Sequence, residues 1–313
     1  MDKVIRIGTR ESQLAVWQAD TVKGLLAQHG YTSELVYIKS EGDTDLTTPL
    51  YEIGVQGIFT RALDIALLKG EIDIAVHSMK DVPTVMAKGI VQAAVLPRAS
   101  YKDLLVPKSN GGEYATFGEW ESNKTPQAVI ATSSIRRKAQ WLNRYPEDRL
   151  ENLRGNVNTR LRKVEESEWH GAIFAAAGLE RINLRPTNAV ELEWMLPAPA
   201  QGAIIVVCKE EDQYCLDACN EFHNKDTALC TAIERDFLRG LLGGCATPIS
   251  ALAQVVDGRV RFAGNILSVD GRQKKEINKE VAIGEAEGLG ASAARELLAN
   301  GGQVILDGIR NGK

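Results

Sequence analysis

The sequence predicts an α/β protein with two lobes that enclose a hinged cleft, followed by a small α+β domain. Up to residue 208, short apolar strands alternate with amphipathic helices, the pattern of βαβ units in parallel sheets. Two connections, near 98–102 and 197–202, would join the lobes. After residue 227 the pattern changes to alternating strands with hairpin turns. At about 150 residues per domain, the 313 residues allow two or three domains.

Apolar periodicity and turn residues assign the elements of the first lobe. An apolar run opens the chain, and a helix with apolar residues on one face follows it. Glycine and proline interrupt the pattern before a second helix, which Gly70 ends. The predicted elements are strands at 4–8, 33–39 and 72–76, helices at 12–28 and 59–69, and a long connection over 41–58.

The second lobe begins near residue 102, after Pro97. The apolar run 203–208 follows the second connection, so we expect it to return to the first sheet as a strand. The other predicted elements are strands at 128–131 and 171–176 and helices at 134–143 and 158–166.

The remaining residues predict the small α+β domain. Residues 250–269 alternate between apolar and polar, and a helix follows near 291–300. Asp257-Gly258 and Asp270-Gly271 are typical hairpin turns. We therefore expect domain 1 at 1–97 plus about 200–219, domain 2 at 103–197 and domain 3 at 223–313.

Composition excludes several classes of protein. With 44% apolar and 25% charged residues the chain has an ordinary globular balance. Its apolar runs fall far short of the ~18 residues of a membrane helix. The first residues lack the apolar core of a signal peptide. We therefore expect a cytoplasmic protein without a membrane partner.

The five cysteines favour reduced thiols, because their number is odd and the chain is large. The spacing of Cys215, Cys219 and His223 would place all three on one face of a helix. Buried structural thiols are nevertheless favoured over a metal site, because histidine is scarce and no CxxC pair supports one. We expect no metal.

Charge is distributed unevenly along the chain. The formal net charge is −4, from 37 basic and 41 acidic residues. Residues 136–163 contain nine Lys or Arg and three acidic residues, a local charge of +6 that leaves −10 elsewhere. Such a concentrated positive field favours a specific anionic ligand. The alternative is a solvated basic face.

Arginines recur where predicted strands lead into helices. Arginine in the first turn of a helix opposes the helix dipole by ~0.3–1 kcal/mol, so its recurrence indicates that an anion occupies these helix ends. Arginine also suits carboxylates, because it pairs with them through two hydrogen bonds. The three segments are Thr9-Arg10-Glu11-Ser12, Thr132-Ser133-Ser134-Ile135-Arg136-Arg137 and Arg154-Gly155-Asn156-Val157-Asn158-Thr159-Arg160.

Two further segments carry reactive side chains. The strand 72–76 leads into Lys80 and Asp81, and Pro83 keeps the turn extended. Asp81 there could stabilise a developing cation or relay a proton; the alternative is a turn cap paired with Lys80. Cys245 follows two glycines, which would make its thiol accessible, so it is the candidate nucleophile; the alternative is a structural turn.

Together these segments resemble the porphobilinogen deaminase family, over residues 4 to about 310. The resemblance implies three domains, of which the first two are similar to periplasmic-type binding lobes. Several long motifs occur in the family's order. They are Thr9-Arg10-Glu11-Ser12-Gln13-Leu14-Ala15, Ala75-Val76-His77-Ser78-Met79-Lys80-Asp81-Val82-Pro83, Thr132-Ser133-Ser134-Ile135-Arg136-Arg137, Leu153-Arg154-Gly155-Asn156, Ala176-Ala177-Gly178-Leu179 and Gly243-Gly244-Cys245.

The resemblance also implies a transferase of tetrapyrrole and haem biosynthesis. A dipyrromethane cofactor, held by a thioether to Cys245, would prime the addition of four porphobilinogen units. Ammonia would leave at each step, and hydroxymethylbilane would be released and passed to uroporphyrinogen-III synthase. The enzyme would be a monomer.

The family's catalytic aspartate corresponds to Asp81, which would stabilise the azafulvenium-type cation left by ammonia. The cofactor and substrate bring an acetate and a propionate on each pyrrole, so the growing chain needs many basic partners. The implied binding residues are Arg10, Ser12, Lys80, Thr132, Ser133, Ser134, Arg136, Arg137, Arg154, Gly155, Arg160, Arg181 and Gln201.

The sequence departs from the family pattern at three places. Gln56 stands where a lysine is usual in the predicted lid at about 42–58, which removes a basic contact. Residues 246–249 and 199–202 also differ from the usual motifs.

Two other functions compete with this interpretation. A non-catalytic two-lobed receptor for a small carboxylate anion would use the same arginines, but it would need neither Cys245 nor Asp81. A nucleic-acid-binding module is disfavoured, because the net charge is negative and few aromatics lie near the basic segment.

Overall fold

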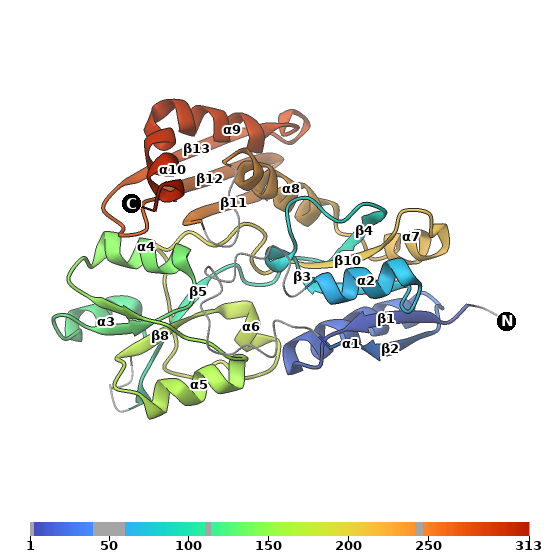
Figure 1. The fold of residues 1–313 in the computed structure, drawn as a ribbon, viewed down its shortest axis with the longest axis horizontal. Helices are drawn as coiled ribbons and strands as arrows, with labels where there is room; N and C mark the ends of the chain where they lie inside the picture. The colour runs from blue at the N-terminus through green and yellow to red at the C-terminus, as the bar shows by residue number, and fades with distance from the viewer. Residues whose placement is uncertain (1–2, 40–59, 110–113, 242–246, 313) are drawn as a thin grey trace. The chain divides into compact units, whose positions relative to one another are not determined.

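The structure is a computed structural model that describes residues 3–39, 60–109, 114–241 and 247–312. It divides into two compact units. Among the described residues, unit 1 holds 3–39, 60–99 and 202–229, and unit 2 holds 100–201 and 230–312. Each unit contains a five-stranded sheet, and unit 2 also contains a three-stranded sheet (Figure 1). The expected α/β lobes and small α+β region are therefore confirmed, whereas the division into three domains remains a prediction.

The sheet of unit 1 is mixed. Its order is β2-β1-β3-β10-β4, in which β1 pairs parallel with β2 and β3 while β10 pairs antiparallel with β3 and β4. The predicted return of 203–208 to this sheet is thus confirmed, although its direction was not predicted. The strands are β1 (Ile5–Thr9), β2 (Ser33–Tyr37), β3 (Ile74–Ser78), β4 (Ile90–Val95) and β10 (Ile204–Lys209), and the helices are α1 (Gln13–Gln28), α2 (Arg61–Lys69) and α7 (Gln213–Asn220).

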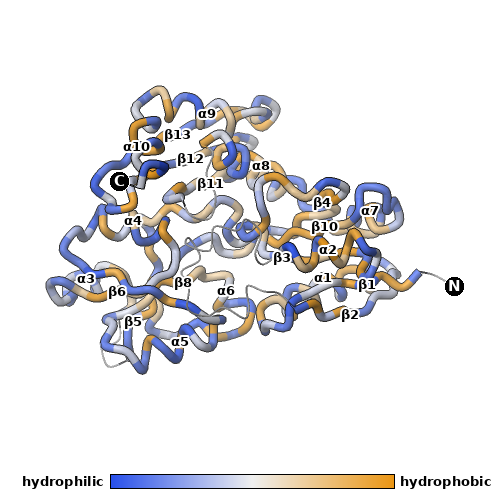
Figure 2. Tube along the Cα trace, viewed as in Figure 1, coloured by the Kyte–Doolittle hydropathy of each residue, from blue (hydrophilic) through white to orange (hydrophobic). Residues whose placement is uncertain are grey.

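Helices cover both faces of this sheet. On one face, α1 and α7 pack their apolar residues against Ile5, Ile74 and Val206 in one buried cluster. On the other face, α2 buries Leu63 and Leu67. Helices α1 and α2 each alternate between apolar and polar residues along their length (Figure 2). This pattern is why their bounds could be predicted within two residues.

The first sheet of unit 2 has the order β7-β6-β8-β5-β9. Here β6 pairs parallel with β7 and β8, while β5 is antiparallel to β8 and β9. Helices α5 and α6 share a buried cluster with one face, and α3 and α4 with the other. The elements are β5 (Asp103–Pro107), β6 (Val129–Ala131), β7 (Arg149–Glu151), β8 (Gly171–Ala175), β9 (Val190–Glu191), α3 (Phe117–Asn123), α4 (Ile135–Arg144), α5 (Val157–Glu166) and α6 (Ala176–Glu180).

The C-terminal part of the chain forms an antiparallel sheet with helices beside it. Asp257 and Gly258, with φ of 51° and 72°, form the predicted hairpin turn. The carbonyl of Gly271, in the second predicted turn, accepts a 2.7 Å hydrogen bond from Asn143 Nδ2 of α4. Helix α8 was not predicted. The elements are α8 (Lys225–Gly240), β11 (Ile249–Val256), β12 (Arg259–Leu267), β13 (Lys274–Ala282), α9 (Leu289–Leu297) and α10 (Gln303–Arg310).

Two sequence-based predictions in unit 1 were wrong in detail. The strand predicted at 72–76 begins two residues later and continues to Ser78, because the Asp73 carboxylate accepts from Arg6 N (2.8 Å) and Arg6 Nε (2.9 Å) before the strand begins. The segment after it is a 3-10 turn over Met79–Asp81, and only Val82 is extended (φ −84°, ψ 129°).

The predicted helix face of Cys215, Cys219 and His223 was also wrong. Helix α7 ends at Asn220, so His223 lies beyond it and its Nδ1 accepts a 3.1 Å hydrogen bond from Val95 N. Among the helices that the structure describes, none combines the length and the apolar character that crossing a membrane requires.

Candidate active site

One edge of the first sheet in unit 2 gathers most of the predicted binding residues. Strands β6, β7 and β8 are parallel, so their carboxyl ends lie at one edge, where helices α4, α5 and α6 begin. Strand β5 runs in the opposite direction, and its first residue, Asp103, pairs with Ala175, the last residue of β8. Asp103 therefore lies at the same edge as the starts of the three helices.

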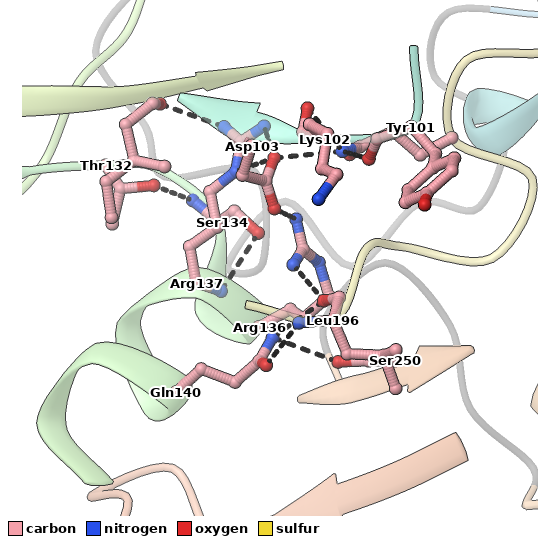
Figure 3. Close-up of polar contacts among 12 residues, drawn as sticks. Tyr101, Lys102, Asp103, Thr132, Ser134, Arg136, Arg137, Gln140, Leu196 and Ser250 are labelled. Carbon is pink, nitrogen blue, oxygen red and sulfur yellow. Dashed lines mark hydrogen bonds and ion pairs between the residues drawn. The ribbon is translucent and has the colours of Figure 1, made fainter. Parts of the chain in front are cut away.

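Asp103 binds two of the predicted arginines and the predicted glutamine (Figure 3). Its Oδ2 accepts from Arg136 Nη2 at 2.7 Å, and its Oδ1 accepts from Arg137 Nη2 at 2.7 Å and Nε at 3.0 Å. Gln201 Nε2 donates to Oδ1 at 2.9 Å. All four residues are buried. Burial alone would raise the pKa of Asp103, but the two guanidinium groups outweigh it and hold the pKa at about 2.

The other nitrogens of the two arginines differ in what they contact. Arg137 Nη1 donates to Ile173 O at 3.0 Å, and Arg136 Nη1 donates to Leu196 O at 2.7 Å. Arg136 Nε is buried and has no hydrogen-bond partner among the described residues. Burial lowers the pKa of Arg136, while Asp103 opposes that shift. An N–H without an acceptor is costly inside a protein, so this atom is a ready donor for a bound carboxylate.

The role of Asp103 could not be predicted from the sequence. Its only signal was a single carboxylate at the start of an apolar run, Asp103-Leu104-Leu105-Val106. The solvated-face alternative is wrong for Arg136, Arg137 and Arg154, which are 4%, 6% and 5% exposed. Arg10 and Arg154 also precede the capping residues of their helices, so the predicted conflict with the helix dipole applies only to Arg136, Arg137 and Arg160.

Side-chain caps fix the start of α4. Ser134 Oγ accepts from Arg137 N, and Thr132 Oγ1 accepts from Ser134 N at 3.2 Å. Thr132 is buried and Ser133 is half-buried between them. These contacts hold the backbone that carries both arginines.

The start of α5 is a separate strand-to-helix junction. Asn156 Oδ1 caps the helix by accepting from Thr159 N at 3.0 Å, and Arg160 Nε donates to Gly155 O at 2.7 Å. Gly155 has φ of +112°, and a Cβ there would lie 2.8 Å from the Thr159 side chain. The close approach therefore requires glycine. Lys163 Nζ donates to Arg154 O at 3.1 Å.

Arg181 lies at the end of the short helix α6. Burial lowers its pKa to about 10, with Glu180 opposing the shift. The side chain therefore remains a cation at neutral pH.

Unit 1 carries the remaining predicted residues at the carboxyl ends of its parallel strands. Ser12 Oγ caps α1 by accepting from Ala15 N at 3.4 Å. Gln18 of α1 donates from Nε2 to Ser78 Oγ at 2.8 Å, at the end of β3. Lys80 and Asp81 follow in the 3-10 turn and are half-buried, as is Arg10 after β1.

Asp81 has no hydrogen bond or ion pair with any of the residues that the structure describes. The alternative of a turn cap paired with Lys80 therefore has no support within those residues. A half-buried carboxylate without an internal partner is available to a ligand.

The buried cysteines are poor nucleophiles. Cys208, Cys215 and Cys219 belong to the core of unit 1. Burial raises the pKa of Cys208 to about 11 and of Cys219 to about 12, and raises that of Cys215 as well. Thiolates, not thiols, attack carbon, so these positions are unreactive at neutral pH. Cys245 and the predicted lid with Gln56 lie outside the described residues.

Comparison with known proteins identifies the family. Residues 5–217 match the family described as "Porphobilinogen deaminase, dipyromethane cofactor binding domain", and residues 228–299 match "Porphobilinogen deaminase, C-terminal domain". The chain belongs to the porphobilinogen deaminase family. The resemblance predicted from the sequence motifs is thus confirmed. The first match also shows that the chain contains the domain that binds the family's dipyrromethane cofactor.

Full-length relatives support the same family. The chain is 40% identical to a porphobilinogen deaminase of Syntrophotalea carbinolica over 307 residues, which cover 96% of this chain and 95% of the relative. It is 40% identical to one from Geobacter sulfurreducens (96% and 93%) and 38% identical to one from Chlorobium phaeobacteroides (99% of each).

Solved structures give a much weaker likeness. The Bordetella pertussis BvgS VFT2 domain has a TM-score of 0.41 and 11% identity, over 70% of this chain and 85% of that chain. A Burkholderia cenocepacia nutrient binding protein bound to methionine has a TM-score of 0.40 and 13% identity, over 72% and 93%. No functional conclusion follows at this level of similarity.

The residues of this porphobilinogen deaminase family member fit a carboxylate-bearing cofactor. Arg136 presents a buried Nε without an acceptor among the described residues. Four further arginines of the predicted set lie in unit 2, three of them at the starts of α4 and α5. In unit 2, Arg136 and the residues around the start of α5 would hold carboxylates of the cofactor.

Proposed function

We propose that the chain is a transferase that deaminates porphobilinogen and joins four units head-to-tail on a covalent dipyrromethane primer. The products are hydroxymethylbilane and ammonia, in tetrapyrrole and haem biosynthesis. The reaction is assigned from membership of the porphobilinogen deaminase family. The structural observation that supports it best is the set of arginines at the carboxyl edge of the unit 2 sheet, including the buried Arg136 Nε. Such donors match the carboxylates that each added pyrrole contributes.

The binding residues divide into two groups in this proposal. Arg136 shares Asp103 with Arg137, so the three groups keep one net positive charge, and Arg136 would bind a carboxylate through its Nε hydrogen bond. Arg154, Arg160 and Arg181 form the second group and would supply further positive charge to bound carboxylates. Cations and donors fixed before binding orient the growing chain at little entropic cost.

Asp81 is the catalytic residue of the proposal. Loss of ammonia from bound porphobilinogen leaves a cationic pyrrole, and an unpaired carboxylate nearby stabilises that charge. The structure gives Asp81 no competing ion pair among the described residues. Its field is therefore not cancelled within the turn that carries it.

The bound dipyrromethane supplies the nucleophilic carbon to which new units are added. We propose its attachment through a thioether to Cys245, which the raised pKa values of Cys208, Cys215 and Cys219 favour by contrast. A monomeric state, a cytoplasmic location and delivery of the product to uroporphyrinogen-III synthase belong to the same proposal. The receptor alternative is not favoured, since the relatives named above are all deaminases.

Intact-protein mass together with a turnover assay tests this proposal. The purified chain should carry a single adduct equal to two deaminated porphobilinogen units and should convert porphobilinogen to hydroxymethylbilane. Cys245→Ser should lose the adduct, because an alcohol is a much weaker nucleophile than a thiol. Cys208→Ser is the matched control and should keep it. An adduct mapped to another cysteine contradicts the attachment site, and reconstituted protein without turnover contradicts the reaction.

A further inference from the structure

A small pocket lies in unit 1 beside the turn that carries Asp81. Its volume is about 20 Å³. Val82 and Pro83, which directly follow Asp81, form part of its wall. Strand β3 contributes His77 and helix α2 contributes Asp64. The other lining residues are apolar.

His77 is a buried titratable group that the proposed reaction does not use. Its side chain is 6% exposed, and Nε2 has no hydrogen-bond partner among the described residues. Burial, with a smaller contribution from Arg10, lowers the pKa of His77 to about 3, so the ring is neutral at neutral pH. A neutral imidazole still has one donor and one acceptor nitrogen. Leaving either nitrogen unsatisfied in the interior destabilises the folded protein.

Asp64 is the second polar group of the pocket. It lies in the first turn of α2, and burial raises the pKa of its carboxyl, with a hydrogen bond from Thr60 opposing the shift. It makes no ion pair with His77 in the structure, so the two polar groups share the pocket without direct contact.

We infer that one ordered water occupies this pocket and bridges His77 Nε2 and the Asp64 carboxylate. A single water needs ~10–15 Å³ and at least two polar partners, and the pocket supplies both. The water satisfies the buried nitrogen of His77. It also connects α2 to the end of β3, the strand that leads directly into the 3-10 turn.

The bridge makes His77 and Asp64 positioning residues for Asp81, a consequence that rests on the proposed function. Val82 and Pro83 form one wall of the pocket, so the contents of the pocket determine where the turn lies. The other side of the turn is fixed by the 3.0 Å hydrogen bond from Met79 N to Ala203 O. Electrostatic stabilisation depends on the position of the carboxylate, so loss of the water should lower kcat.

A crystal structure of the holoenzyme with ordered waters tests the bridge itself. We expect a water within ~2.6–3.2 Å of both His77 Nε2 and an Asp64 carboxylate oxygen. A dry pocket, or a water that bonds only one of these atoms, would overturn the inference. This readout does not use activity, so it separates failure of the bridge from failure of the proposed function.

Kinetics of variants test the positioning role. Asp64→Leu and His77→Phe each remove one polar partner, and each should lower kcat roughly three- to ten-fold, the equivalent of about one hydrogen bond, with KM unchanged. The double variant should lose no more than the worse single variant, because both act through one water. Asp64→Asn retains a hydrogen-bonding group and should restore most of kcat.

The matched control is Ile65→Ala, on the same helix but 42% exposed, which should leave kcat unchanged. Losses that multiply in the double variant, or an Asn variant as slow as the Leu variant, would overturn the positioning role. If His77→Phe does not fold, the three residues compared at position 64 still decide the question.

Discussion

At the scale of single residues, Asp81 separates catalysis from structure. Asp81→Asn preserves the size of the side chain but removes its charge, so ring addition should slow by roughly 10²–10³-fold. Asp81→Glu retains the charge one methylene away and should keep partial activity, because position also contributes. Single-turnover assays on preassembled holoenzyme measure the step. An Asn variant as active as the Glu variant would indicate a structural role instead.

Arg136 shows how burial changes the expected effect of a substitution. The sequence predicts that replacing Arg136, Arg154 or Arg160 by Leu weakens cofactor assembly or elongation with little effect on folding. For Arg136 the structure corrects the folding part, because Arg136→Leu leaves buried Asp103 with one guanidinium instead of two. Because Arg137 still neutralises Asp103, the loss is that of the charged hydrogen bond and should cost ~1.5–3 kcal/mol of unfolding free energy. Arg160→Leu loses one hydrogen bond to Gly155 O and should cost about 1 kcal/mol. Urea denaturation of the apo forms compares them, and equal losses would contradict the role of Asp103.

His77 should make the protein sensitive to mild acid. Its pKa is about 3 in the folded protein, below the ordinary histidine value of 6.5, so only the unfolded chain binds this proton between those values. The contribution of the neutral ring to stability is therefore fully present above pH 6.5. Below about pH 6 the free energy of unfolding falls by up to ~1.4 kcal/mol for each pH unit. Unfolding free energies of wild type and His77→Phe between pH 4.5 and 7 isolate the effect. Parallel pH profiles would show that His77 does not titrate this way.

At the scale of elements, helices with a clear cap and one apolar face could be predicted from the sequence. Ser12, Ser134 and Asn156 cap α1, α4 and α5, because short polar side chains satisfy the first free N–H groups. Strand β5 and helix α8 could not be predicted in the same way. The function of Asp103 in β5 depends on residues more than 30 positions away, and no local pattern encodes such a partner.

Gly155 tests whether the α5 junction must keep its shape. Gly155→Ala forces a side chain into φ of +112° and within 2.8 Å of Thr159, so we expect a loss of at least ~1–3 kcal/mol and a higher KM for porphobilinogen. Gly24→Ala, inside α1 with nothing within 4 Å of the new Cβ, is the control and should stabilise by ~0.5–1 kcal/mol. Denaturation and steady-state kinetics measure both. An unchanged KM would exclude the junction from substrate binding.

At the scale of the whole molecule, two places where the chain passes between units lie inside connections expected from the sequence. Both predicted connections contain a unit boundary, at Ala99/Ser100 and at Gln201/Gly202. Among the described residues a further boundary, after Leu229, falls inside α8. No sequence pattern marks this boundary, because the helical periodicity of α8 continues unbroken across it.

Glu234 of α8 connects distant parts of the chain within unit 2. Its buried carboxylate accepts from Ala200 N at 2.6 Å and from Ala253 N at 2.7 Å, so a single side chain holds the second connection and strand β11. Glu234→Gln replaces one acceptor oxygen by a donor that faces a backbone N–H, and should cost ~2–4 kcal/mol of unfolding free energy. Asp236→Asn on the same helix removes an exposed ion pair with Arg239 and an attraction to Arg235, and should cost less than ~1 kcal/mol. Urea denaturation of both variants decides the point: if they unfold at the same concentration, the buried carboxylate does not hold these segments together.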